Sequence, residues 1–161
     1  MATFLMRRNQ GVLRFDPKSN KTTTVIPDDA FHLSADADEK LLAVSRWFPT
    51  GGRNTQEEFG IRLYKLPSMK LTTTFAIEKH QLVTGTLSPD GRLLACEASD
   101  LKSHGPHSII VFDTATGEQV ARRKGFGFVE IVFSPKGDML FLPHKGYMEG
   151  EPVAVWKLPE R

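Results

Sequence analysis

The chain has 161 residues, with 21 Lys and Arg against 19 Asp and Glu, so its formal net charge is +2. This near-balance gives no general electrostatic attraction to nucleic acid or to an anionic membrane. A hydrophobic content of 40% is enough for a core that needs neither disulfides nor a metal. The single cysteine, Cys96, excludes a disulfide framework and fits a reducing compartment, so we expect a soluble, cytoplasmic protein. No apolar run is long enough to span a membrane.

Short apolar or Thr-rich runs, separated by turn residues, follow one another along the chain, and no window has a sustained helical period. Three strands are expected first, two units of four strands follow, and the last unit has three strands. The tally is 14 strands in a single domain. The unit boundaries fall at about 1–27, 28–80, 81–126 and 127–161.

Two stretches, 87–95 and 133–141, repeat one pattern: an apolar strand, a Ser-Pro-x-Gly turn and a second apolar strand. Pro followed by Gly is β-turn chemistry. A third stretch begins at 33–36 and reaches the same apolar pair, Leu41-Leu42, after two extra residues. The pattern predicts three similar hairpins.

A second signature is a short apolar run that ends in an aromatic residue. These aromatics stand at Phe15, Tyr64, Phe112 and Trp156, every 44–49 residues, and a polar turn with another strand follows the first three. A complete unit therefore has four strands, a to d, with fixed a–b and c–d turn types. A period of about 40–45 residues with four antiparallel strands is typical of a β-propeller blade. A β-sandwich is the alternative, but it gives no matched order of turns.

On these residues the chain resembles the WD-repeat β-propeller family in a degenerate, bacterial form. The resemblance is carried by the turns at 88–91 and 134–137, by Phe112-Asp113 and by Val155-Trp156. The Gly-His pair of the family is absent, and its Trp-Asp pair survives only as Phe15-Asp16 and Phe112-Asp113. The resemblance implies an all-β repeat protein with about three and a half blades.

Fourteen strands leave three arrangements open. They are a four-bladed ring with two thin blades, an arc completed by a second copy or another chain, and a piece of a longer propeller. We favour completion by a partner, because blades with this turn chemistry usually occur in rings larger than four. The strand at 153–158 is expected to pair with the N-terminal strand at 3–8, from its own chain or from another copy.

In such a blade the b–c and d–a connections lie on one face. The b–c connections are long here, at 47–56, 99–107 and 144–151, and a basic and aromatic d–a run lies at 122–128. Binding residues concentrate on loops held by a rigid scaffold, and Trp, Tyr and Arg are enriched at interface hot spots. Tolerated insertion is the alternative. The candidate partner-binding residues are Trp47, Phe48, Arg53, Lys102, His104, His107, Phe126, His144, Tyr147 and Met148.

No motif predicts a metal, a cofactor or a catalytic nucleophile. His104 and His107 are only two imidazoles, and the segment after Asp36 lacks the glycine and glutamate of a calcium loop. Cys96 has no basic neighbour in sequence, which indicates an inert, buried thiol. We therefore expect a non-catalytic scaffold that binds a protein partner, and we expect no nucleic acid.

Two alternatives to this scaffold remain. The chain is a structural half of a larger propeller, or it is an enzyme with a site at the central channel. The candidate residues of that site are His32, His80, Glu130 and the loop histidines His104, His107 and His144. A perturbed histidine pKa beside a deep pocket favours the enzyme.

Burial provides a check on the blade register. Nine apolar residues at matching blade positions are expected to be buried: Leu33, Leu42, Leu87, Leu94, Ile110, Phe112, Phe133, Leu140 and Val155.

Overall fold

The computed structural model describes residues 3–7, 11–27, 30–45, 60–100, 107–126, 130–143 and 153–159. This part of the chain contains fourteen strands and no helix, arranged in four antiparallel sheets of three or four strands. The expected all-β architecture with blade-like sheets is confirmed.

Each sheet is a simple meander of strands consecutive in sequence. The first sheet comprises β1 (Thr3–Arg7), β2 (Gly11–Asp16) and β3 (Lys21–Ile26), and the second β4 (His32–Ala35), β5 (Leu41–Ser45), β6 (Ile61–Lys65) and β7 (Lys70–Phe75). The third comprises β8 (His80–Leu87), β9 (Leu93–Asp100), β10 (His107–Asp113) and β11 (Gln119–Phe126). The fourth comprises β12 (Val132–Phe133), β13 (Met139–Pro143) and β14 (Val153–Lys157).

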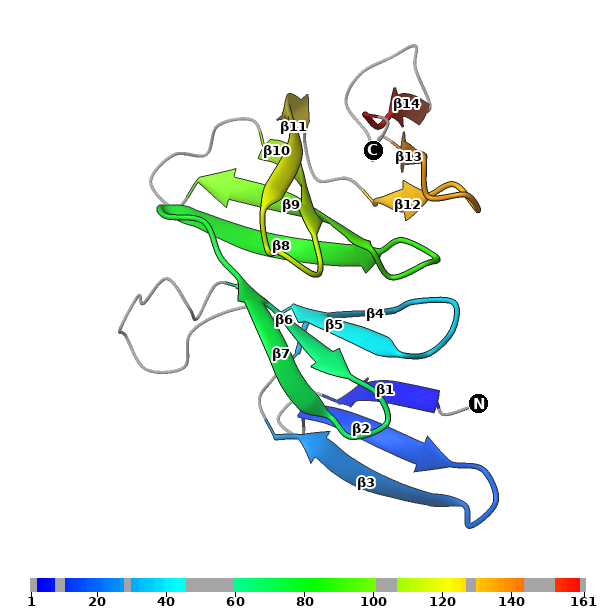
Figure 1. Ribbon diagram of the computed structural model, residues 1–161. Coiled ribbons are helices and arrows are strands. Elements are labelled where there is room, and N and C mark those ends of the chain that lie inside the picture. The colour runs from blue at the N-terminus through cyan, green and yellow to red at the C-terminus, as the bar shows by residue number, and fades with distance from the viewer. Residues whose placement is uncertain are drawn as a thin grey trace.

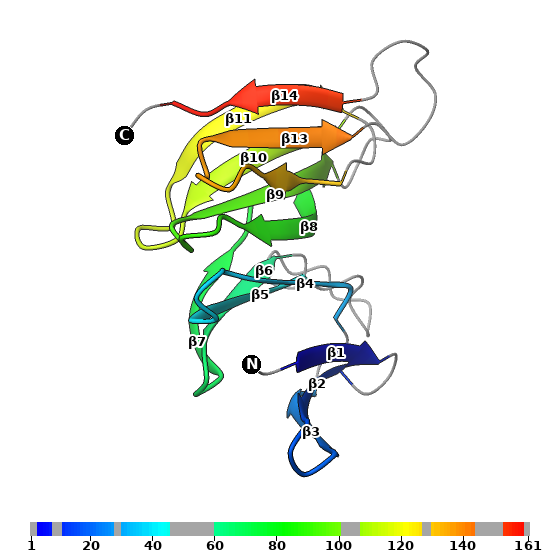
Figure 2. The ribbon, with the colours of Figure 1, turned by 90° about the vertical axis from the view of Figure 1, so that its right-hand side faces the viewer.

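The four sheets follow one another in chain order as an open arc. The first sheet lies at the bottom of Figure 1 and the fourth at the top, and Figure 2 shows the same order from the side. Among the described strands, β1 pairs with β2, β14 pairs with β13, and the two lie at opposite ends of the arc. Pairing of the strand at 153–158 with the N-terminal strand of its own chain is therefore wrong, because three sheet interfaces separate them.

The hydrophobic core consists of three clusters, one at each interface between neighbouring sheets. The first and second sheets bury a cluster that includes Val12 and Tyr64. The second and third bury Leu63 and Phe112, and the third and fourth bury Val111 and Leu140. The middle sheets are therefore apolar on both faces, which explains why their central strands read as nearly continuous hydrophobic runs.

Seven of the nine residues expected in the core are buried, at 8% exposure or less: Leu42, Leu87, Leu94, Ile110, Phe112, Phe133 and Leu140. Leu33 is half-buried. The expectation for Val155 is wrong, since this side chain is 54% exposed. It lies on the face of the fourth sheet that no other described sheet covers.

The three a–b turns are built alike. Ser88 Oγ accepts the Leu93 N–H at 2.9 Å and Ser134 Oγ accepts the Met139 N–H at 3.1 Å. Asp36 Oδ1 accepts the Leu41 N–H at 2.9 Å. In all three turns the donor N–H belongs to the residue five positions after the acceptor. The expectation of two extra residues in the first of these turns is therefore wrong. Asp36 occupies the position of the turn serine, and the three turns have equal length.

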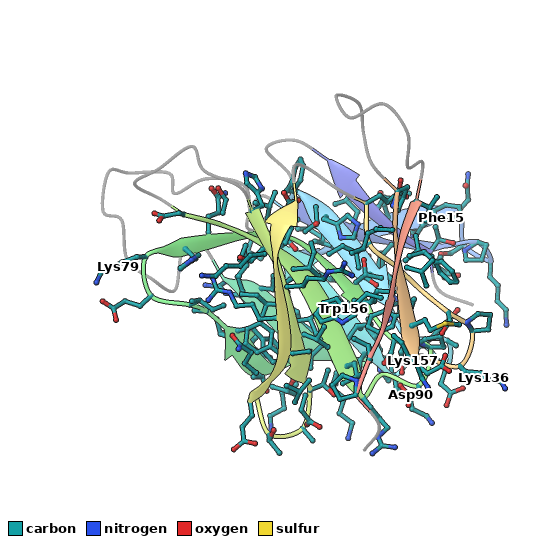
Figure 3. All side chains as sticks on the ribbon, turned by 90° about the horizontal axis from the view of Figure 1, so that it is seen from above. Phe15, Lys79, Asp90, Lys136, Trp156 and Lys157 are labelled. Carbon is teal, nitrogen blue, oxygen red and sulfur yellow. The ribbon has the colours of Figure 1, made fainter. Side chains whose placement is uncertain are left out.

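The a–b turns and the d–a connections lie on opposite sides of the arc. In Figure 3, Asp90 and Lys136, from neighbouring a–b turns, lie together at the lower right, whereas Lys79, just before β8, lies at the left. Neighbouring a–b turns are also bonded to each other, since Ala37 N–H donates to Pro89 O at 2.9 Å. The scaffold therefore has two opposite faces, one formed by the a–b turns and the other by the d–a connections.

Candidate functional site

Most of the predicted partner-binding residues lie outside the part of the chain that the structure describes. These are Trp47, Phe48, Arg53, Lys102, His104, His144, Tyr147 and Met148. Phe126 is the last residue of β11, and its side chain is not described. His107 is described, as the first residue of β10. The role assigned to these residues stays a prediction.

A cavity of about 830 Å³ lies along the inner strands of the second, third and fourth sheets. The strands β4, β8 and β12 supply most of its wall. Each is the first strand of its sheet and forms one edge of that sheet. The cavity extends from His32 and Glu130, which follow d–a connections, to Ala37 and Pro89 in the a–b turns. Its apolar wall includes Phe31, Leu33, Val83, Leu87, Ile131 and Phe133.

His32 stands at the d–a end of this cavity. Its Nδ1 lies 3.1 Å from Gly85 O on the neighbouring sheet. A carbonyl oxygen only accepts, so Nδ1 carries the proton and Nε2 of the neutral ring has a free lone pair. Burial lowers the pKa of His32 below 6.5, although the Gly85 hydrogen bond and the charge of Glu130 oppose this. The ring is therefore neutral near pH 7.

A buried carboxylate lies in the wall of the same cavity. Glu97 in β9 is 1% exposed, and its Oε1 is bonded to Nδ1 of His107 in β10. A weak signal for this pair is present in the sequence, because Glu97 is the one charged residue within the apolar run of its strand.

A β-bulge faces Glu97. Leu82 pairs with Ala98 and Gly85 pairs with Cys96, so Val83 and Thr84 together stand opposite Glu97. Thr84 lines the cavity, and its buried Oγ1 has no hydrogen-bond partner. Bulges re-aim side chains and occur often beside functional sites. Sequence patterns did not reveal this bulge, because it depends on pairing across two strands.

Other candidates do not contribute to this cavity. His80 is not part of its described wall; its Nδ1 lies 2.9 Å from Glu78 O and its Nε2 is 3.3 Å from Arg122 Nη2. Cys96 is buried, and burial together with the charge of Glu97 raises the pKa of its thiol. Among the described residues, no three His, Cys, Asp or Glu side chains are grouped to hold a metal ion. Nor does this part form a helix with the length and hydropathy needed to cross a bilayer.

Comparisons with known proteins identify the fold. No family model matches the sequence, and no curated protein matches it. Two β-propeller-containing structures align over almost the whole chain: hydrazine synthase of Kuenenia stuttgartiensis, with a TM-score of 0.68 and 16% identity over 97% of this chain, and U3-55K, with a TM-score of 0.69 and 17% identity over 98%. The chain is thus similar to β-propeller proteins in fold. It spans just under half of those chains, 47% and 46% respectively.

Proposed function

We propose that the chain is a non-catalytic binding module that holds a protein partner on the face of the b–c and d–a connections. The observation that carries this proposal is the cavity along β4, β8 and β12, which extends to this face at His32 and Glu130. A concave, mostly apolar site with a few polar groups is the usual form of a binding pocket. The proposal includes degenerate WD-type blades, which the repeated turns support. It also includes a cytoplasmic location, which the free, buried Cys96 supports.

The lining of the cavity favours a cationic side chain of the partner. Its described wall includes the acidic side chain of Glu130 and that of Glu97, which is already bonded to His107, and contains no Lys or Arg. His32 adds no positive charge near pH 7, because its pKa is lowered by burial. Thr84 Oγ1 is an unused hydrogen-bonding group in the same wall. A Lys or Arg side chain brings an apolar stem and a cationic end, and so suits both parts of this wall.

Fluorescence anisotropy with labelled peptides tests this proposal. The probes are Leu- and Ala-flanked peptides with a central Lys or Arg, and the same peptides with norleucine there. We expect the cationic peptides to bind more tightly, and Glu130→Gln to weaken them roughly two- to fivefold, the scale of an exposed ion pair. Glu118→Gln, an exposed glutamate in the c–d turn of the third sheet, is the matched control. Equal binding of cationic and norleucine peptides contradicts the proposal.

A second candidate function is an enzyme, and the observation that favours it is His32. A neutral histidine with a free Nε2 lone pair beside a cavity is a reasonable general base. A screen of ester, amide and phosphoester substrates tests this candidate. Turnover that His32→Gln abolishes, while peptide binding persists, supports the enzyme; the absence of turnover with all three substrate classes leaves the binding module.

A further inference from the structure

The fourth sheet has an apolar face that resembles the buried faces of the sheets before it. For each sheet, we call the side toward the next sheet in chain order its forward face and the other side its rear face. The rear face of the fourth sheet carries Phe133, Leu140, Leu142 and Trp156, packed against the third sheet. Strand alternation places Val132, Phe141, Val153 and Val155 on its forward face.

Cross-strand pairing sets the blades in a common register. The pairs Leu42↔Tyr64, Leu94↔Phe112 and Leu140↔Trp156 join equivalent positions of strands b and c in the second, third and fourth sheets. The residues one position before each aromatic are therefore equivalent from sheet to sheet, and so are the residues three positions before it. These forward-face pairs are Ile61 and Leu63, Ile109 and Val111, and Val153 and Val155.

Their exposures differ sharply. Ile61 and Leu63 are 0% and 2% exposed, under the third sheet, and Ile109 and Val111 are both 0% exposed, under the fourth. Val153 and Val155 are 44% and 54% exposed, and Val132 on the same face, which also lines the cavity, is 44% exposed. Contiguous apolar patches of this kind mark interaction sites. The fourth sheet therefore has the side chains of an inter-blade interface without the covering blade.

The rear face of the first sheet has the complementary character. Leu5 pairs with Leu13 in the register of Cys96 and Ile110, which are 0% exposed in the core between the second and third sheets. Phe15 is equivalent to Phe112 of that core and is half-buried, and Leu5 is 44% exposed. Leu13 on this face is 8% exposed, and Thr3 stands where the third sheet has Leu94. The first sheet thus presents Leu5 and Phe15 as the apolar residues of its rear face that another sheet could cover.

We propose that these two faces bind each other between two copies of the chain, head to tail. Each of the three interfaces inside the chain joins a forward face to a rear face, so the contact between copies continues the same series. Such a heterologous contact made twice closes a ring. Two copies together have about the length of each propeller-containing neighbour, because one chain spans just under half of it. The occupant of the exposed forward face is therefore the first sheet of a second copy.

Light scattering on the eluting chain at low micromolar concentration tests the proposal. We expect twice the 18.0 kDa chain mass for the unmodified protein. Val155→Asp should give the mass of one chain with an unchanged far-ultraviolet spectrum. Leu71→Asp is the matched control, because Leu71 is 45% exposed on the outermost strand of the second sheet. This variant should keep the double mass.

A second variant distinguishes the head-to-tail arrangement from a back-to-back one. Leu5→Asp should also dissociate the pair, and an equimolar mixture of Leu5→Asp and Val155→Asp should recover a double mass, because one intact interface remains. A single-chain mass for the unmodified protein overturns the proposal, as does a double mass that Val155→Asp leaves unchanged. Dissociation by Val155→Asp but not by Leu5→Asp also overturns it, since two fourth sheets would then face each other.

Discussion

At the scale of single residues, the a–b turns share one backbone requirement. Gly91 and Gly137, each three residues after the turn serine, have φ angles of 71° and 74°. Glu39 takes the same position after Asp36, with a φ of 54°. The left-handed region favours glycine and strains other residues. The second sheet therefore keeps a strained residue where its neighbours have glycine.

Replacing this residue should stabilise the protein. We expect Glu39→Gly to increase the free energy of unfolding by about 0.5–1 kcal/mol, because it removes the left-handed penalty of a non-glycine residue. Gly137→Ala should decrease it by a similar amount. Urea denaturation followed by circular dichroism measures both changes. A loss of stability in Glu39→Gly contradicts the equivalence of the three turns.

The turn serines couple stability to pH. Ser134 Oγ donates to Asp138 Oδ1 at 2.7 Å and lowers the pKa of that carboxyl. Burial raises the pKa of Asp90, but the hydroxyl of Ser88 and the N–H of Arg92 lower it further than burial raises it. Because both folded pKa values lie below 3.8, the unfolded chain binds more protons in acid, and this stability is lost as pH falls below about 4.

Removing one hydroxyl should reduce that pH dependence. In Ser134→Ala, we expect the loss of unfolding free energy between pH 5 and pH 3 to be smaller than in the unmodified protein. Stability at pH 7 should fall by about 1 kcal/mol for the lost hydrogen bonds. Ser68→Ala, in an exposed c–d turn, is the control and should keep the original pH slope. An unchanged slope in Ser134→Ala shows that the Asp138 carboxyl is not coupled to folding.

At the scale of elements, β8 forms part of the cavity wall and packs closely against the second sheet at Gly85. A Cβ on Gly85 would lie 2.5 Å from Ile61 Cδ1 and 3.3 Å from Leu94 Cδ1. The carbonyl of Gly85 also holds His32, 3.1 Å away. One glycine thus permits both the packing of two sheets and the orientation of the cavity histidine.

Substituting this glycine should affect both properties. Gly85→Ala should cost about 1–3 kcal/mol of unfolding free energy, the usual range for overpacking a core, and should also weaken peptide binding at the cavity. Gly125→Ala, which adds no atom contact within 4 Å but takes a φ of 98°, strains the backbone away from the cavity and should leave peptide binding unchanged. Melting curves and peptide anisotropy measure the two effects. A Gly85→Ala protein as stable as the unmodified one contradicts the close packing.

The sequence predicted strands and turns better than side-chain environments. Ser-Pro-x-Gly and Asp-Thr-Ala-Thr-Gly are local signals, so the order of strands within each sheet followed from them. The role of Asp36 was missed because a carboxylate and a hydroxyl accept the same backbone N–H. The cavity was missed because its wall joins β4, β8 and β12, which lie about 50 residues apart in the chain.

At the scale of the whole molecule, one repeating interface accounts for the arc, the core and the exposed face. The forward faces of the second, third and fourth sheets carry apolar residues at the same positions, and only their coverage differs. In the first sheet, Arg14 stands at one of these positions. Val155 was expected to be buried because its blade position is a core position. That position is buried only when another sheet follows, which is a property of the assembly rather than of local sequence.

The thermal unfolding of Val111→Asp and Val155→Asp, followed by far-ultraviolet circular dichroism, tests this repeating interface most directly. The two valines hold the same blade position, at 0% and 54% exposure. An unpaired carboxylate in the core costs several kcal/mol, a large part of a domain's 5–15 kcal/mol. We predict that Val111→Asp does not fold and that Val155→Asp keeps a β-sheet spectrum with a cooperative transition. Equal behaviour of the two variants, whether both fold or neither does, would contradict the account.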